Sequence, residues 1–226
     1  MNKINFYEFI GIMIGDGCVL YYPHHKVYGI EITGNADEER DYYQMMSEFL
    51  EKKFKKIPRV YIKHEKSAKC LKLVMYGKKI AEYFIKNGIT CHKTYTAIIK
   101  DNFLHWNKSR HIIRGIFETD GSLYFSKAGA KTRPDYPRLT IKTSSPKLAE
   151  QIKKILKEQL FRVHSHKDGK TEVIYLSGTE MLEKWIKDIG LNSEKNITKY
   201  KLWKKLGHYI PRISLRERKA LLNSAS

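Results

Sequence analysis

Phe9-Ile-Gly-Ile-Met-Ile-Gly-Asp16-Gly17 and Ile113-Arg-Gly-Ile-Phe-Glu-Thr-Asp120-Gly121 are two versions of one motif. Each is a short apolar stretch that ends in Asp-Gly, one near the amino terminus and the other in the second half of the chain. Their apolar spacing predicts a helix in both places. Two matching helices that each end in a carboxylate predict a pseudo-two-fold protein, in which each half contributes one acid to a shared site.

The composition indicates the kind of partner. The chain has 226 residues, with 43 Lys and Arg against 24 Asp and Glu, a formal net charge of +19. This length allows one large domain or two of about a hundred residues, each able to bury a core. So large a positive excess favours a polyanionic partner, most commonly nucleic acid. The alternative is a basic surface that is merely solvated.

Several other classes of protein are disfavoured. No apolar run approaches the ~20 residues of a membrane-spanning helix, so we expect no membrane partner. No signal-like apolar core develops between Met1 and Glu8, so we expect an intracellular protein of the cytoplasm, nucleoid or organelle matrix. Cys18, Cys70 and Cys91 form no CxxC pair, and they read as reduced thiols rather than a disulfide framework or a zinc site.

The segments after each motif repeat in the same order. After the first motif we expect strands and helices at Cys18–Tyr22, Val27–Thr33, Glu38–Lys53 (helix), Arg59–Lys63, Cys70–Tyr76 and Lys78–Asn87 (helix). After the second we expect them at Ser122–Ser126, Arg138–Thr143, Pro146–Leu160 (helix), Arg162–His166, Thr171–Ser177 and Thr179–Ile189 (helix). The fold class is therefore α+β, with tandem αββαββα repeats related by a pseudo-two-fold axis.

The repeat also predicts the domain division. We expect an amino-terminal half at residues 1–99, a linker at 100–108 and a carboxy-terminal half at 109–226. The main mismatch between the halves is a longer hairpin loop, Lys127–Tyr136. The basic stretch Lys195–Lys219 predicts a partly buried helix held by Ile197, Leu202, Trp203 and Leu206.

Small residues in the motifs indicate how the two helices meet. Gly11 and Gly15 are four residues apart in the first copy, and Gly115 and Thr119 take the same places in the second. Small residues at this spacing let two helix backbones approach closely. Because glycine inside a helix costs ~1 kcal/mol relative to alanine, paired glycines call for a packing reason. We therefore predict that the motif helices pack on each other at the interface between the halves.

The ends of these helices predict a metal site. Gly17 and Gly121 suit the left-handed residue that ends a helix, which places Asp16 and Asp120 in the last turn. The negative end of the helix dipole disfavours a carboxylate there, and two carboxylates brought together repel each other. One acid would take up a proton unless a cation lies between them. Oxygen ligands without Cys or His favour magnesium over zinc or copper.

Taken together, these residues resemble the LAGLIDADG homing endonucleases in their single-chain form with two motifs. The likeness covers residues 5–206, although Phe9, Ile10, Ile14 and Arg114 depart from the family's letters. It implies motif helices at the interface and two antiparallel sheets that form a saddle over DNA. It also implies that Asp16 and Asp120 bind divalent metal at the scissile phosphates, with backbone carbonyls from Gly15 and Thr119. Lys93 and Lys195 match the family's basic residues near each active centre.

The strands should carry specificity. A two-stranded ribbon fits the major groove of DNA, and alternate residues of a strand point to one face. Hydrophobic positions such as Ile30, Ile32, Leu139 and Ile141 should face the core, which leaves their neighbours to face DNA. The candidate DNA-binding residues are Tyr22, His24, Glu31, Thr33, Arg59, Tyr61, Lys63, Lys72, Arg138, Thr140, Lys142, Arg162, His164 and His166.

The resemblance thus implies a monomeric, intron-encoded endonuclease that uses Mg²⁺, or Mn²⁺ in its place, and no organic cofactor. It would hydrolyse one phosphodiester on each strand of a long pseudo-palindromic site in double-stranded DNA and leave 3′ overhangs. Two alternatives stay open: a maturase that binds intron RNA, and a catalytically inactive DNA-binding protein on the same fold. Retention of both Asp16 and Asp120 argues against the last of these.

Overall fold

The chain folds as two repeats, each in the order helix, two strands, helix, two strands, helix. The structure, a computed structural model, describes residues 3–65, 68–129 and 132–224. The first repeat contains α1 (Phe6–Ile14), β1 (Gly17–Tyr22), β2 (Val27–Asn35), α2 (Arg40–Phe54), β3 (Arg59–Glu65), β4 (Ala68–Tyr76) and α3 (Lys78–Lys86). The second contains α4 (Trp106–Asp120), β5 (Gly121–Ser126), β6 (Tyr136–Thr143), α5 (Pro146–Glu158), β7 (His164–Asp168), β8 (Thr171–Ser177) and α6 (Thr179–Asp188). Two further helices follow, α7 (Glu194–Leu206) and α8 (Leu215–Asn223). The predicted fold class is confirmed.

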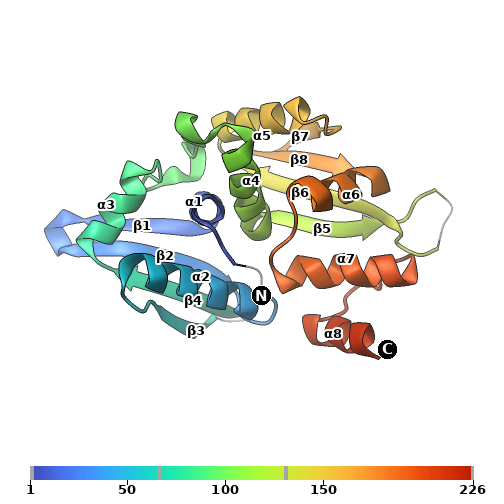
Figure 1. Cartoon of the computed structure of the whole chain (residues 1–226), viewed down its shortest axis with the longest axis horizontal. Coiled ribbons are helices and arrows are strands. Elements are labelled where there is room, and N and C mark those ends of the chain that lie inside the picture. The colour runs from blue at the N-terminus through green and yellow to red at the C-terminus, as the bar shows by residue number, and fades with distance from the viewer. Residues whose placement is uncertain (1–2, 66–67, 130–131, 225–226) are drawn as a thin grey trace.

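Each repeat builds one four-stranded antiparallel sheet. The strand orders are β1-β2-β4-β3 and β5-β6-β8-β7, so the two sheets have the same topology. The registers also correspond, since Val19 lies opposite Ile30 in the first hairpin and Leu123 opposite Leu139 in the second. Figure 1 shows the sheets at opposite ends of the long axis of the molecule, with α1 and α4 between them.

Alternation along the strands decides which face of each sheet is buried. Ile30 and Ile32 in β2, and Leu139 and Ile141 in β6, are almost completely buried, as the sequence predicts. Helices α2 and α3 pack on this face of the first sheet, and α5 and α6 on that of the second. We call the opposite faces of the two sheets the open faces, because many of their side chains, such as Arg59 and His164, are exposed.

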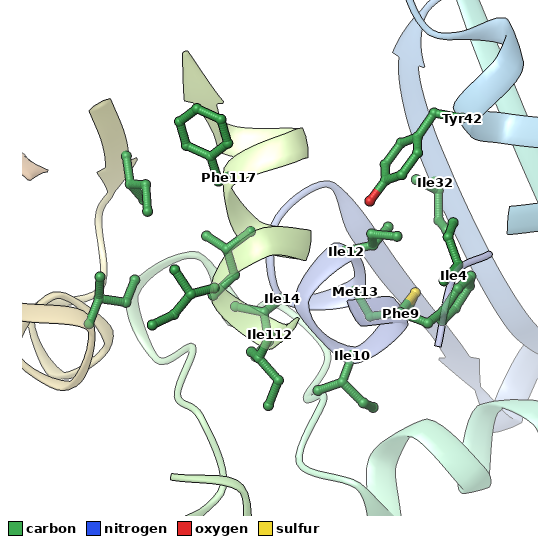
Figure 2. Close-up of a cluster of buried hydrophobic side chains, with 14 of the residues drawn as sticks. Ile4, Phe9, Ile10, Ile12, Met13, Ile14, Ile32, Tyr42, Ile112 and Phe117 are labelled. Carbon is green, nitrogen blue, oxygen red and sulfur yellow. The ribbon is translucent and has the colours of Figure 1, made fainter. Parts of the chain in front are cut away.

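Helices α1 and α4 pack against each other between the two sheets. An added Cβ at Gly11 would lie 2.9 Å from the carbonyl carbon of Ile112, and one at Gly115 would lie 2.8 Å from the backbone nitrogen of Ile12. The helix backbones are therefore in direct contact, and the prediction that the motif glycines form the helix interface is correct. Figure 2 shows Phe9 and Met13 of α1 directed toward the first sheet, away from α4.

A buried polar network joins the halves beside this contact. The Glu8 carboxylate accepts from Nη2 of Arg114 at 2.7 Å, from the Tyr42 hydroxyl at 3.0 Å and from Nδ2 of Asn192 at 2.8 Å. Arg114 also donates to the carbonyl of Ile189 at 2.9 Å. A buried charge is costly without partners, and here each Glu8 oxygen has at least one. Arg114, one of the residues that depart from the motif, thus pairs with Glu8.

The segment between the halves is shorter than the sequence suggests. Helix α4 begins at Trp106, inside the predicted linker, and Asp101–Phe103 forms a short 3₁₀ turn. The preceding chain is tied to α5, since Ile99 exchanges two 2.8 Å hydrogen bonds with the Gln151 side chain and Ser145 donates to the Ala97 carbonyl at 2.7 Å. Residue 109, the predicted start of the second half, therefore lies inside a helix.

The basic carboxy-terminal stretch forms two helices rather than the single predicted one. Gly207, at φ 72°, ends α7 in the left-handed conformation that glycine adopts without strain. Ser214 then begins α8 with a capping box, in which its side chain and that of Glu217 accept from each other's backbone N–H groups. Leu202 and Trp203 are buried as expected, whereas Leu206 is exposed. Among the helices of the described residues, none is long and apolar enough to cross a membrane.

Replacing Gly11 by alanine tests the helix contact. Intrinsic helix propensity alone would make Gly11→Ala stabilising by ~1 kcal/mol. Because the new methyl group would collide with the α4 backbone, we expect instead a loss of about 1–3 kcal/mol and a Tm several degrees lower. Thermal unfolding measures this change in Tm, with Lys79→Ala on the exposed side of α3 as the control. An unchanged or higher Tm for Gly11→Ala would contradict close packing.

Candidate active site

The packing of α1 and α4 brings the two motif acids together. Asp16 follows the end of α1 by two residues and Asp120 is the last residue of α4. An added Cβ at Gly15 would lie 3.0 Å from Cβ of Thr119 and 3.3 Å from Oδ2 of Asp120. The Asp120 carboxylate thus lies beside the end of the opposite motif helix. Both acids remain accessible to solvent, although the helices that carry them are buried.

The glycines that follow the acids have a different role from the predicted one. Gly121 has φ −98° and ψ 168°, an extended conformation, and Gly17 begins β1 without a positive φ. Their lack of a side chain instead permits close packing on the preceding helical turn. An added Cβ would lie 2.6 Å from Sδ of Met13 at Gly17, and 2.5 Å from Cδ2 of Phe117 at Gly121. The prediction of left-handed helix ends was therefore wrong.

The electrostatics of the acids are those of a crowded pair. Although Asp16 is accessible at the motif end, the protein around its carboxyl displaces water and raises its pKa to about 7; the Asp120 and Glu39 carboxylates add to the rise, while Lys195 and Lys93 oppose it. Burial also raises the pKa of Asp120, against the lowering effect of Lys93. The protein therefore holds two carboxyls in a place that favours protonation, and a cation would relieve this cost.

Each of the predicted lysines lies close to a motif end. Nζ of Lys93 donates to the Gly15 carbonyl at 2.5 Å, and burial lowers the pKa of this lysine while Asp120 and Asp16 oppose the change. Nζ of Lys195 donates to the Glu118 carbonyl at 3.2 Å and to Oε1 of Glu39 at 2.5 Å. The structure thus brings both lysines to the two acids.

The donor set fits a hard divalent cation only in part. Asp16 and Asp120 supply carboxylate oxygens, and the Gly15 carbonyl lies beside them but accepts from Lys93. The Thr119 hydroxyl donates to the carbonyls of Gly115 and Ile116, both at 3.0 Å. Within the described ranges, no three His, Cys, Asp or Glu side chains are grouped to hold a metal. A cation here would need additional oxygen ligands from water or substrate.

The open face of the first sheet carries most of the residues predicted for it. Cross-strand partners share a face, and the register aligns Thr33 with Lys72 and Lys72 with Tyr61. Glu31 and Lys72 form an ion pair at 2.6 Å there. The residues predicted on this face from alternation are Glu31, Thr33, Arg59, Tyr61, Lys63 and Lys72, and Tyr22 shares it. His24 is exposed in the short turn Pro23–His25 between β1 and β2.

The open face of the second sheet is less uniform. Arg138 donates to the hydroxyls of Ser126 at 3.1 Å and Ser177 at 3.3 Å, so it is already engaged by its own sheet. Nζ of Lys142 lies 3.6 Å from Oδ2 of Asp168. His164 and His166 are exposed, with ring centroids 5.3 and 5.7 Å from that of Tyr175. Thr140 lies on this face but is only 8% exposed.

One predicted strand residue lies elsewhere. Arg162 falls in the irregular segment between α5 and β7, and β7 begins only at His164. Its guanidinium pairs with Glu180 of α6 at 2.7 Å, on the side of the sheet that the helices cover. The prediction that Arg162 faces DNA from a strand was therefore wrong, since pairing with β8 starts two residues later than the sequence pattern suggested.

Sequence reasoning missed three polar residues that lie around Lys195. Glu39 pairs with Lys195 from the opposite half. Glu118, fully buried, accepts from the backbone of Asn192 at 2.6 Å and from the side chains of Ser193 and Asn196. Burial lowers the pKa of Lys199 to about 8, and its Nζ donates to the Leu123 carbonyl at 3.3 Å. For Glu118, the sequence offered one signal: an acidic residue at a position of the second motif that should be buried.

Comparison with known proteins agrees with this geometry. Residues 107–201 match the model of the LAGLIDADG-like domain. The second repeat is a LAGLIDADG-like domain. The comparison with curated proteins gave no match.

Solved structures of LAGLIDADG proteins align with most of the chain. The homing endonuclease I-DmoI, in complex with DNA and Mn, aligns with a TM-score of 0.56 and 18% identity over 82% of this chain and 96% of that one. The meganuclease I-SmaMI, bound to uncleavable DNA, aligns with a TM-score of 0.61 and 10% identity over 91% of both chains. The amino-terminal LAGLIDADG domain of DUF199/WhiA aligns with a TM-score of 0.52 and 16% identity over 82% of both. At these identities the likeness shows the fold alone.

The raised pKa of Asp16 predicts a pH-dependent effect on stability. Its ordinary value is 3.8, so the folded chain binds this proton more tightly than the unfolded chain. The ionised carboxylate therefore destabilises the fold fully above pH about 7, and the effect fades as pH falls toward about 4. We expect Asp16→Asn to raise the Tm of the metal-free protein at about pH 8 and to raise it less at about pH 5.

Thermal shift assays measure both values, with Asp37→Asn on the exposed surface as the control. Added Mg²⁺ should raise the Tm of the wild type at about pH 8, because an ion held by the two carboxylates would bind only the folded chain, and it should raise that of Asp16→Asn less. A stabilising effect of Asp16→Asn that grew as the pH fell would contradict the unfavourable burial of this carboxylate.

Proposed function

We propose that the protein is a divalent-metal-dependent endonuclease that cuts both strands of DNA at a specific site. The observation that carries this proposal is the pair Asp16 and Asp120, held together by the α1–α4 contact and accessible at the motif ends. Their raised pKa values support an unfavourable environment for the two negative charges. Such an environment is typical of a functional site.

The open faces of the two sheets support a nucleic-acid substrate. They are polar, they flank the acids through β1 and β5, and they belong to a chain of formal charge +19. The solved structures of I-DmoI and I-SmaMI that share this fold hold DNA. An antiparallel ribbon has the dimensions of the major groove, so strand residues such as Arg59 and Lys142 are placed to reach base edges or phosphates.

In this proposal the side chains divide the chemistry. Asp16 and Asp120 would hold Mg²⁺ or Mn²⁺, with the Gly15 and Thr119 carbonyls as further oxygen donors. When bound there, such a metal would supply an activated water and would stabilise charge on the attacking and leaving oxygens. Lys93 and Lys195 offset the charge of the scissile phosphates. Because Lys93 donates to the Gly15 carbonyl in the free protein, its turning to a phosphate would release that oxygen.

Finer features of the activity belong to the same proposal. One chain supplies both acids, so the enzyme acts as a monomer. Its two halves divide near the start of α4, and it acts inside the cell. The two open faces carry unlike side chains. The cross-strand pair Thr33 and Lys72 in the first sheet corresponds to Lys142 and Val173 in the second. The DNA site is therefore long and only approximately palindromic. Cutting near the pseudo-two-fold axis leaves short 3′ overhangs, as in the intron-encoded enzymes of this family.

Cleavage by the two acids is the first test. A DNA site is selected from a randomised library by binding, cloned into a plasmid and incubated with protein and Mg²⁺. We expect a linear product with the wild type, and a loss of at least about a hundredfold in rate for Asp16→Asn and for Asp120→Asn, each of which should still bind.

Two outcomes would overturn the nuclease proposal. Full cutting by either variant would exclude the acids from the chemistry. Binding of the selected DNA without any cutting by the wild type would favour a DNA-binding protein without nuclease activity. The LAGLIDADG domain of DUF199/WhiA shares this fold as well, so the fold alone does not decide between the two.

Substitution on the open face tests the DNA-binding surface. Arg59 is exposed on β3, and we expect Arg59→Ala to weaken binding of the selected DNA and to reduce the slope of log K against log salt by about one. Lys79→Ala removes the same charge from α3, on the helical side, and should change neither. Fluorescence anisotropy over a range of salt concentrations measures both. Equal effects of the two variants would show that only overall charge matters.

A further inference from the structure

At the candidate site, Glu39 of the first half forms an ion pair with Lys195 of the second half. Nζ of Lys195 lies 2.5 Å from Oε1 of Glu39, and the two side chains are only 16% and 11% exposed. A pair so enclosed holds its geometry better than a surface ion pair, because neither group can easily exchange its partner for water.

The other oxygen of Glu39 is held by its own half. Oε2 accepts from the backbone N–H of Asn35 at 2.8 Å, so the carboxylate is fixed at both oxygens. Gly34 makes room for it, since an added Cβ at this glycine would collide with Oε2 of Glu39. The end of β2 and the start of α2 therefore form a cradle for this side chain, which aims Oε1 at Lys195.

The second half braces the same turn of α2 from outside. Arg218 of α8, almost completely buried, pairs with Glu38 and donates to Oγ1 of Thr198 at 2.9 Å. Lys219 pairs with Asp41 at 2.8 Å. Residues on both sides of Glu39 are thus tied to the carboxy-terminal helices, and α7, which carries Lys195, belongs to the same unit.

The corresponding position of the second repeat lacks a carboxylate. Ser145 precedes α5 as Glu39 precedes α2, and its hydroxyl donates to the Ala97 carbonyl at 2.7 Å. Lys93, the counterpart of Lys195, donates to the Gly15 carbonyl as Lys195 does to the Glu118 carbonyl, but within the described residues it forms no ion pair like that of Lys195 with Glu39. The two lysines near the acids are therefore held by different groups.

We propose that Glu39 is a positioning residue that holds Lys195 at one of the two cleavage centres, so that the two DNA strands are cut under different control. This inference rests on the proposed nuclease function. Lys195 acts on the phosphate of one strand, and Glu39 fixes its Nζ beside Asp16. The other centre depends on Lys93 and needs no such acid.

Strand-specific cleavage tests the assignment. With supercoiled plasmid carrying the selected site, Glu39→Gln should convert substrate to nicked circle at the wild-type rate and convert nicked circle to linear DNA at least about tenfold more slowly. The nick should lie on the same strand in every product. Glu39→Asp should recover part of the second rate, and Asp37→Asn, which removes a nearby exposed charge, should behave as the wild type.

Epistasis separates positioning from a general structural role. On a Lys195→Met background, Glu39→Gln should have no further effect, because its target is already gone. Equal slowing of both strands, or additive effects of the two substitutions, would overturn the proposal. A wild-type rate for both strands in Glu39→Gln would do the same.

A measurement without DNA or metal keeps this inference separate from the proposed function. The Nζ of Lys195 should react with an amine-acylating reagent at least about fivefold faster in Glu39→Gln than in Asp37→Asn, as measured by peptide mass spectrometry. If the wild type cuts no DNA but this change is seen, the nuclease proposal fails and the positioning of Lys195 stands. An unchanged reactivity of Lys195 would show that Glu39 does not hold it.

Discussion

Backbone contact between α1 and α4 is the constraint on which the rest of the structure depends. Gly11 and Gly115 let the two helices meet without intervening side chains, and this sets the separation of the two sheets and of the two acids. A side chain at either position would push the helices apart by the width of a methyl group or more. Because Asp16 and Asp120 extend from the ends of these helices, their spacing follows directly from the packing.

Such a tight, apolar contact leaves little room for polar groups, and those beside it are paired. Glu8 and Glu118 are each fully buried and accept several hydrogen bonds. Asn192 donates to both of them, through its side chain to Glu8 and its backbone to Glu118. Breaking one member would leave a charge without partners, which costs far more than the loss of an exposed pair. The network therefore fixes the segment before α7 relative to both motif helices.

The sequence predicts features that depend on local periodicity, and it fails where a contact joins distant segments. Alternation placed Glu31, Thr33 and Lys72 on one face of the first sheet, because the side-chain period of a strand is a local property. Arg162 was misplaced because the start of β7 is set by its pairing with β8, not by its own residues. No local pattern distinguishes Glu39 from the acids beside it, or indicates that Lys195 is its partner. The pairing of the two acids was predictable from the two motifs, whereas the backbone conformation at the helix ends and the groups that hold the lysines were not.

The repeated fold does not impose equal surroundings on its two halves. When Gly11 is aligned with Gly115, the buried acid Glu118 corresponds to Ile14, and Glu8 corresponds to Ile112. Each motif helix therefore carries one buried carboxylate, but at a different position along the helix. Glu118 lies close to the end of α4 and binds Asn192, Ser193 and Asn196 around Lys195, whereas Glu8 lies at the far end of α1, away from Lys93. Because a single chain encodes both halves separately, such differences can persist without disturbing the shared helix contact. The glycines thus maintain the symmetric packing of the backbone, while the longer side chains make the surroundings of the two lysines different.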